Sequence, residues 1–107
     1  MDIKIRKNSI RAYISIGNLF YVNAAGVQQV EELAEVIGKL ENLRVLYLRH
    51  TLWGDRELIP LKKLPHLRVL NLSFSRVTDA GVKELEELKG LRGLYLYSSG
   101  VEDWEER

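Results

Sequence analysis

A six-residue word occurs three times in this chain at a fixed spacing. Residues 43–48 read LRVLYL, residues 67–72 read LRVLNL and residues 91–96 read LRGLYL, so the two intervals between copies are equal. We call this interval the period. A short fixed period is typical of stacked supersecondary units, each of which is too small to bury its apolar face alone. The repeat therefore predicts the architecture of the chain, but it does not name a binding partner.

The similarity between the copies continues beyond this word. Hydroxyl residues, apolar residues and an aspartate recur in the same order, and they are Thr51, Ser75 and Ser99, then Trp53, Val77 and Val101, then Asp55, Asp79 and Asp103. The alignment predicts two regular repeats, 43–66 and 67–90, and a last partial repeat with a carboxy-terminal cap, 91–107. Because tryptophan side chains are largely buried on average, we predict that Trp53 lies in the core.

Within each copy, the spacing of the apolar residues changes from a strand pattern to a helical pattern. Residues 46–48 alternate as leucine, tyrosine and leucine, which is typical of a half-buried strand. Aliphatic residues three positions apart follow in the second half of the next copy, and they are Val82, Leu85, Leu88 and Leu91. This spacing predicts a short helix or a 3₁₀ turn, with Thr78 as its N-cap. Pro60 fits only the first turn of a helix, so we expect 55–64 to be broken or 3₁₀-like.

The first copy of the repeat matches the others less clearly. We align Ile14-Ser15-Ile16 with 46–48, although this interval is longer than the period, and expect the first strand there. Segment 17–42 would then hold a longer first-repeat helix, with Asn23 as its N-cap and Gly38 near its end. Ahead of it, 3–6 and 10–16 flank a short polar turn, which predicts a hairpin. Residues 1–16 are therefore expected to form an amino-terminal hairpin cap and the first strand.

Composition limits the class of protein. The chain has 107 residues, 46% of them apolar and 29% charged, with a net charge of +1, which fits a single small globular domain over 1–107. Near-neutrality argues against a binder of nucleic acids or membrane surfaces. The lack of cysteine, of a signal-peptide pattern and of an apolar run approaching about 20 residues indicates a soluble, cytoplasmic protein.

The word L-x-x-L-x-L followed by a helical stripe resembles the leucine-rich repeat family. The similar variety is the short bacterial-type or ribonuclease-inhibitor-like repeat, which reads V-T-D-A-G after the strand. Residues 77–81 match that word fully and 22–26 match it partly. The resemblance implies an α/β solenoid with a parallel sheet on its concave face and helices on its convex face, and it implies protein binding. The chain departs from the pattern at His50, Phe74 and Ser98, where this variety often has a small residue.

Side chains between the strand leucines are expected to form one contiguous grid on the concave face. Stacked strands lie about 4.8 Å apart, and tyrosine and arginine are enriched at interface hot spots. The predicted partner-binding residues are Tyr47, Arg49, Asn71, Ser73, Tyr95 and Tyr97, with His50 and Phe74 at the rim. The simpler alternative is that tyrosines only pack well on a sheet surface.

Two other periodic sets have structural explanations. The hydroxyls of Thr51, Ser75 and Ser99 are expected to hydrogen-bond the backbone of the neighbouring coil. Three arginines, Arg44, Arg68 and Arg92, recur at the strand-entry edge and would form a column. Such a column could bind a polyanion, although a solvated edge is the simpler interpretation.

The sequence contains no motif for catalysis or cofactor binding. The two histidines, His50 and His66, lack metal-ligand spacing, and there is no glycine-rich phosphate loop or nucleophile-elbow serine. We therefore predict a noncatalytic protein-binding module, without cofactor or metal, that is a monomer or a subunit of a larger complex. The alternatives are a structural subunit that associates through its ends, with Trp104 exposed there, and an RNA-binding module whose tyrosines stack on bases.

Overall fold

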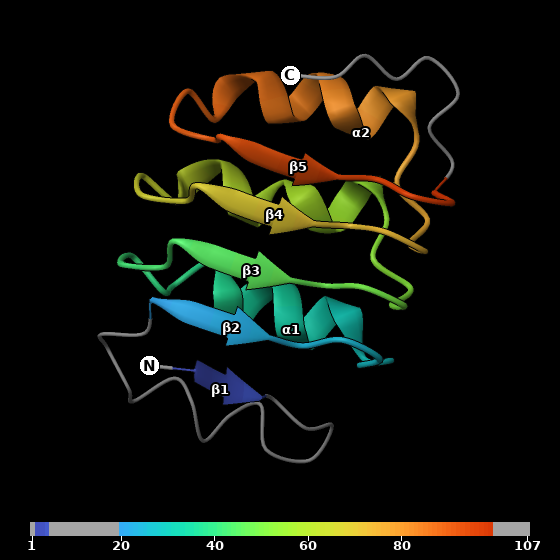
Figure 1. Cartoon of the computed structure of the whole chain (residues 1–107), viewed down its shortest axis with the longest axis horizontal. Helices are drawn as coiled ribbons and strands as arrows, with labels where there is room; N and C mark the ends of the chain where they lie inside the picture. Colours follow the sequence, from blue (N-terminus) through green and yellow to red (C-terminus); the bar gives the residue numbers. More distant parts are fainter. Residues whose placement is uncertain (1, 5–19, 100–107) are drawn as a thin grey trace.

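A computed structural model describes residues 2–4 and 20–99. Within these ranges a five-stranded sheet runs in the order β1-β2-β3-β4-β5, and every neighbouring pair of strands is parallel (Figure 1). The strands are β1 (Asp2–Lys4), β2 (Tyr21–Asn23), β3 (Val45–Tyr47), β4 (Val69–Asn71) and β5 (Gly93–Tyr95).

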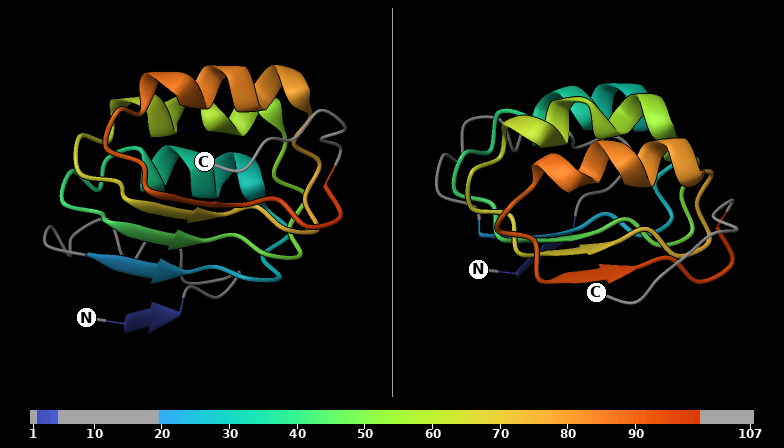
Figure 2. Two further views of the ribbon diagram at one scale, coloured as in Figure 1. Left: turned by 45° about the horizontal axis from the view of Figure 1, so that its top comes forward. Right: turned by 90° about the horizontal axis from the view of Figure 1, so that it is seen from above.

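Helices pack against one face of this sheet (Figure 2). Two are α-helical, α1 (Val30–Ile37) and α2 (Asp79–Glu84), and three are 3₁₀ helices, η2 (Asp55–Leu58), η3 (Pro60–Lys63) and η4 (Leu85–Glu87). The chain is thus a small α/β domain with a parallel sheet and short helices. Within the described residues, no helix combines the length and the apolarity that crossing a membrane requires.

The register of the sheet follows the period of the sequence. Val22 pairs with Leu46, Leu46 with Leu70, and Leu70 with Leu94, so each step along the sheet equals one period. The hydrogen bonds that follow the strands repeat in the same way. The amides at positions 24, 48 and 72 donate to the carbonyls at 47, 71 and 95, each at 2.8 Å. Backbone pairing therefore places equivalent side chains of successive copies side by side.

The predicted position of the first copy is wrong. The neighbour of β3 is β2, which is Tyr21–Asn23, and not a strand at Ile14-Ser15-Ile16. Val22 lies one period before Leu46, so this copy has the regular spacing and contains no insertion. β1 pairs in parallel with β2, with Ile3 opposite Val22, and the other arm of the predicted hairpin, 10–16, lies outside the described residues.

Asn23 is therefore the last residue of a strand and not the N-cap of a helix. Its Oδ1 accepts a hydrogen bond from the Ala25 amide at 3.1 Å, as Oδ1 of the equivalent Asn71 accepts one from the Ser73 amide at 3.0 Å. Helix α1 begins after Gln29 instead and ends at Ile37, and its C-cap Gly38 lies near the helix end, as predicted. An asparagine at a strand exit makes the same local bond as an asparagine cap, which explains the misassignment.

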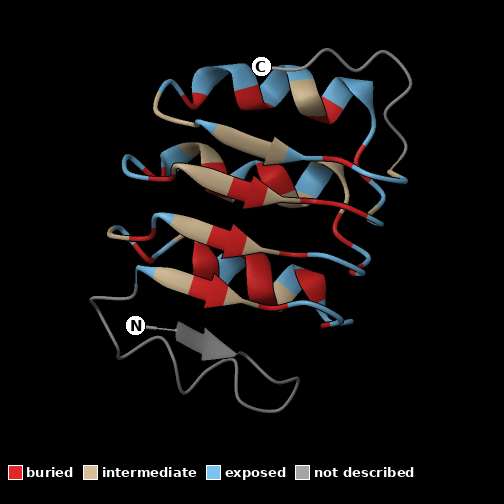
Figure 3. Ribbon diagram, viewed as in Figure 1, coloured by how far each residue is buried: buried red, intermediate tan, exposed pale blue. Residues whose placement is uncertain are grey.

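The core lies between the sheet and the helices (Figure 3). The central residue of β2, β3 and β4 is fully buried in each case, and the opposite layer consists of helical residues such as Leu33, Ile37, Leu58 and Leu61, which are also fully buried. Trp53 has 0% exposure, which confirms its predicted core position. Its indole Nε1 has no hydrogen-bond partner among the described residues.

The second return segment is built from two 3₁₀ helices, as predicted from Pro60. Pro60 occupies the first position of η3, where a missing backbone N–H leaves no hydrogen bond unmade. Helix α2 has Thr78 at its N-cap, also as predicted, but the Thr78 side chain makes no capping bond within that helix. Its hydroxyl donates to the carboxylate of Asp55, which also accepts the Thr78 amide at 2.8 Å. The cap is therefore supplied by the preceding copy.

The predicted bonding of the periodic hydroxyls is wrong. Thr51 Oγ1 donates to the carbonyl of Leu48 at 2.7 Å, and Ser99 Oγ donates to the carbonyl of Leu96 at 2.9 Å. Both bonds join positions three apart in the same coil and do not reach the neighbouring coil. The hydroxyls of Thr51 and Ser99 thus close the local turn by which their own strands end, and Ser75 Oγ accepts a bond from the Val77 amide. Coils are linked by backbone groups and by the side chains of Ser73 and Asp55.

Candidate functional site

The face of the sheet opposite the helices carries no helix among the described residues (Figure 2). Two rows of side chains cross this helix-free face, because the register places Tyr21, Val45, Val69 and Gly93 in one row and Asn23, Tyr47, Asn71 and Tyr95 in the other. Tyr21 and Tyr47 meet edge to face, with ring centroids 5.2 Å apart. A contiguous grid is therefore present over β3, β4 and β5 as expected, but its next members come from β2, Tyr21 and Asn23, and not from the strand predicted at 14–16.

A hollow of about 390 Å³ lies beyond the carboxyl ends of β3, β4 and β5. Its lining consists of Arg49, Asn71, Ser73, Phe74, Tyr95, Tyr97 and Ser98. Most of the residues predicted to bind a partner therefore come together here. The two that do not line the hollow lie beside it, because His50 stacks on Phe74 and Tyr47 is the strand partner of Asn71.

Backbone geometry explains how the rim of this hollow is formed. Gly26, His50, Phe74 and Ser98 all have positive φ angles, of 81°, 57°, 58° and 51°, and each lies one period after the one before. The first three amides donate to the carbonyls at 49, 73 and 97, at 2.7 to 3.1 Å. This left-handed conformation favours glycine, since a Cβ there crowds the following carbonyl. Positions 50, 74 and 98, where the leucine-rich repeat pattern often has a small residue, are thus the positions at which the chain leaves a strand.

The rim side chains form a stack of rings and a cation. His50 and Phe74 lie nearly parallel, at an interplanar angle of 8° and a centroid separation of 4.4 Å. The Arg49 guanidinium carbon lies 5.1 Å from the centroid of the Phe74 ring, which is a cation–π contact. These contacts hold Arg49 at the edge of the hollow and limit the conformations of Phe74.

The aromatic side chains around the hollow are exposed to solvent. The exposed fractions are 38% for Phe74, 48% for Tyr95 and 74% for Tyr97. Large apolar side chains that gather at a hollow while exposed are typical of interaction surfaces. Ser98 also lines the hollow and was not predicted, although its position one period after Phe74 could have indicated it.

Ser73 is a correction within the predicted site. We expected its side chain to point outward, but Ser73 is only 2% exposed, and its hydroxyl accepts a hydrogen bond from the Tyr97 amide at 3.1 Å. The strand alternation ends at Leu72, so two consecutive residues turn inward. Ser73 therefore positions the chain at Tyr97 and presents little surface of its own.

The three periodic arginines, Arg44, Arg68 and Arg92, are joined by backbone hydrogen bonds. The Arg68 amide donates to the Arg44 carbonyl at 2.8 Å, and the Arg92 amide donates to the Arg68 carbonyl at 2.7 Å. The Arg44 guanidinium lies 5.3 Å from the Phe20 ring centroid, and Arg68 Nη1 donates to the Leu67 carbonyl. The binding of an anion by this column stays a prediction.

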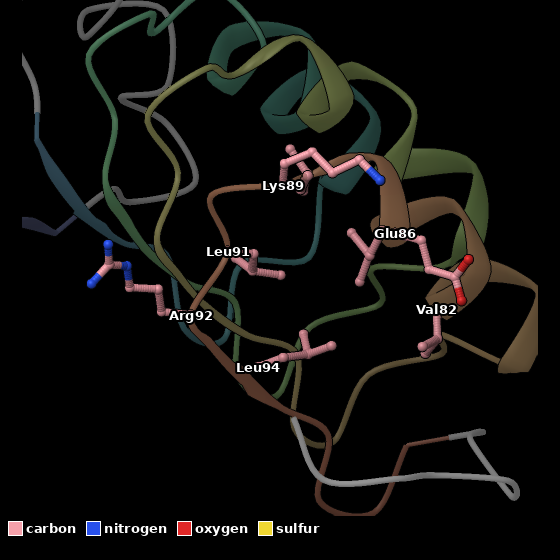
Figure 4. Close-up of a pocket in the computed structure, with 8 residues that line it drawn as sticks. Val82, Glu86, Lys89, Leu91, Arg92 and Leu94 are labelled. Atoms are coloured by element: carbon pink, nitrogen blue, oxygen red, sulfur yellow. The ribbon is translucent and has the colours of Figure 1, made fainter.

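A second hollow, of about 250 Å³, lies at the carboxy-terminal end of the described core (Figure 4). Val82, Leu85, Leu88, Leu91 and Leu94 form its apolar part, and Glu86, Lys89 and Arg92 form the rest of its lining. Leu91 and Leu94 are only half-buried, whereas the equivalent Leu67 and Leu70 are 1% and 0% exposed. The predicted last repeat and carboxy-terminal cap, 91–107, is described only as far as residue 99, so Trp104 lies outside the described residues.

The charged groups of the helical face form a different arrangement. Lys62 Nζ lies 2.6 Å from Glu84 Oε2 and 3.2 Å from Glu87 Oε2. The hydrogen bond to Glu84, together with the one to Glu87, raises the pKa of Lys62 above its ordinary value of 10.5. Over the described residues, no group of three or more histidine or acidic side chains is arranged to hold a metal ion.

The arrangement is that of a small α/β domain with an exposed aromatic hollow beside its sheet. No protein-family model matches the chain, and no curated protein matches it. A solved structure described as "Leiomodin-1 Actin-Binding Site 2 (ABS2)" is similar, with a TM-score of 0.64 and 16% sequence identity, over 86% of this chain and 60% of that chain. The likeness at this identity is one of fold, and the chain spans 60% of the length of that structure.

Proposed function

We propose that this chain is a short leucine-rich-repeat solenoid that binds a protein partner without catalysis, through the helix-free face of its sheet. The observation that carries the proposal is the hollow beyond β3–β5, which exposed Phe74, Tyr95 and Tyr97 line together with Arg49. Tyrosine and arginine are the residue types that dominate interface energetics when they are clustered. The constant register, with one period between neighbouring strands, supports the repeat architecture.

The chemistry of the hollow favours binding over catalysis. Its described lining includes neither a carboxylate nor a histidine, so no side chain there is suited to take up a proton at neutral pH. The solved structure of similar fold is, by its description, an actin-binding site of another protein. That description supports a protein-interaction role for the fold and does not identify the partner of this chain.

Paired variants test the proposal. We expect Tyr95→Ala/Tyr97→Ala to reduce the capture of partner proteins by the immobilised chain by at least about tenfold, because two exposed hot-spot side chains are lost. The matched control is Leu52→Ala/Ile59→Ala, which removes two apolar side chains with 41% and 58% exposure away from the hollow. Circular dichroism verifies that both variants fold. Equal capture by the two variants, measured by quantitative mass spectrometry, would refute the proposal.

A second candidate function, as a structural subunit, is favoured by the apolar hollow at the end of the core. Two half-buried leucines and a neighbouring arginine there offer a surface for end-to-end association. If the chain assembles in this way, light scattering will detect a self-associated species whose formation is abolished by Leu91→Lys. A wild-type chain that stays monomeric at high concentration would eliminate self-assembly through this end.

A further inference from the structure

The two halves of each copy differ in charge. The strand segments 20–27, 43–50, 67–74 and 91–98 contain four arginines and one histidine but no aspartate or glutamate. The return segments 28–42, 51–66 and 75–90 contain ten acidic and seven basic side chains, which gives a net charge of −3. A protein with a net charge of only +1 therefore separates its charges, and the sheet and its two edges carry the positive part.

Arg49 is the charged residue of the hollow. Its guanidinium forms no ion pair with any described residue, and its described contact is with the Phe74 ring. A guanidinium offers five hydrogen-bond donors in a plane, and a contact with one ring does not use the donor edge that binds carboxylates. Within the part of the chain that the structure describes, the hollow thus contains a positioned cation without a counter-charge.

The polar groups around Arg49 are also able to donate hydrogen bonds. Asn71 Oδ1 accepts the bond from the Ser73 amide, which leaves the Asn71 side-chain NH₂ as a donor. The phenol groups of Tyr95 and Tyr97, the hydroxyl of Ser98 and the largely buried hydroxyl of Ser73 make up the rest of the polar lining. The described lining is rich in donors and holds one positive charge and no carboxylate, which makes it complementary to an acceptor that carries a single negative charge.

We infer that the hollow binds a carboxylate of an acidic, extended segment of a partner protein, with Arg49 as the residue that pairs with it. This inference rests on the proposed function. A phosphate carries about −1.5 to −2 charges at neutral pH and is usually held by clusters of arginines, whereas a carboxylate matches one guanidinium. The exposed rings of Phe74, Tyr95 and Tyr97 provide contacts for apolar residues that flank the acidic one.

The experiment begins with the selection of random twelve-residue peptides, displayed on phage, against the immobilised full chain. We expect the selected peptides to share an aspartate or glutamate next to an apolar residue. Binding of one synthetic peptide is then measured by fluorescence anisotropy with the wild-type chain and with Arg49→Gln. We expect Arg49→Gln to weaken binding about 10- to 100-fold, which is the effect of losing a hydrogen bond to a charged group.

The matched control is Arg56→Gln, which makes the same change at an exposed arginine of η2 and should leave the affinity unaltered. Replacing the acidic residue of the peptide by its amide should weaken binding to the wild-type chain equally. The two changes together should cost less than the product of their separate effects, because they remove the same interaction. Thermal unfolding verifies that Arg49→Gln remains folded.

Other outcomes separate the inference from the proposed function. Peptides that depend on Tyr95 and Tyr97 but not on Arg49 would leave protein recognition intact and overturn the acidic partner. Peptides that depend on neither would overturn both, and so would a selection that yields no peptide. A fluorescent twelve-nucleotide RNA that binds more tightly than any selected peptide, in a manner dependent on Arg49, would assign the cation to nucleic acid and overturn the inference.

Discussion

The strand half and the return half of each copy differ in regularity. Strands β2 to β5 are each three residues long, keep one register, and lead to a left-handed residue three positions after the strand. The returns differ from one another: α1 has eight residues, the second return has two four-residue 3₁₀ helices, and the third has the six-residue α2 followed by the three-residue η4.

The difference teaches which interactions enforce the period. A parallel ladder fixes each inner strand through hydrogen bonds to both neighbouring strands, so adding or removing one residue within a strand would misplace the side chains that follow it there. A return has only to bury its apolar residues against the sheet, and an α-helix and a 3₁₀ helix both do so. A return can therefore accommodate Pro60 by changing its helix type. A strand exit instead keeps the left-handed conformation even at His50 and Phe74, where this conformation is less favourable than at a glycine.

The largest effect that we expect comes from truncating a buried strand leucine. Leu70 has no exposed surface, so Leu70→Ala should lower the free energy of unfolding by about 2–5 kcal/mol. Ile59→Ala, in the return before it, should change it by less than about 0.5 kcal/mol, because Ile59 is 58% exposed. Urea denaturation measures both values. A loss for Leu70→Ala as small as that for Ile59→Ala would show that the strand layer is not the core.

A smaller effect tests the left-handed strand exits. Gly26 has φ of 81°, and a Cβ at this position would meet no atom within 4 Å. Gly26→Ala should therefore lower the free energy of unfolding by about 1 kcal/mol through backbone strain alone. Gly26→Asn should cost less, since asparagine visits this conformation more readily. If thermal unfolding shows alanine and asparagine to be equally harmless, the exit geometry does not constrain the residue.

The smallest effect lies on the helical face. Because the pKa of Lys62 is raised on folding, its pairing with Glu84 and Glu87 stabilises the protein below pH 10.5 and is lost as the pH rises through the raised value. We expect Lys62→Gln to lower the melting temperature slightly at pH 8, and to do so less in high salt, because the pair is solvent-accessible. The difference should vanish at strongly alkaline pH. A difference that grows with pH would contradict this pairing.

Much of the fold could be predicted from the sequence where the alternation was strong. The strands at 45–47, 69–71 and 93–95 follow from the repeated leucines, and the 3₁₀ return follows from Pro60. Strand β2 was misplaced, because Val22 and Ala24 give a weaker apolar alternation than Ile14 and Ile16, although Val22 lies one period before Leu46. The period and the pairing with β3 identify this strand, whereas local alternation alone does not.

The candidate site was predictable to a similar extent and for a related reason. Arg49, Asn71, Tyr95 and Tyr97 lie on or just after the strands of successive copies, so a constant register brings them together. The buried position of Ser73 was not predictable from alternation, because the chain turns inward after Leu72. The stack of His50 on Phe74 depends on the left-handed backbone at both residues, and neither residue type signals that conformation.

The constant register between strands also has a consequence for how such a molecule can grow. Residues 43–66 begin and end at equivalent points of the ladder, so a tandem duplication of this segment would present the same hydrogen-bonding groups to both neighbours. Each added copy would lengthen the sheet by about 4.8 Å and supply one more row of variable side chains. Duplication of a single segment would thus enlarge the helix-free face of the sheet without redesigning the rest of the protein.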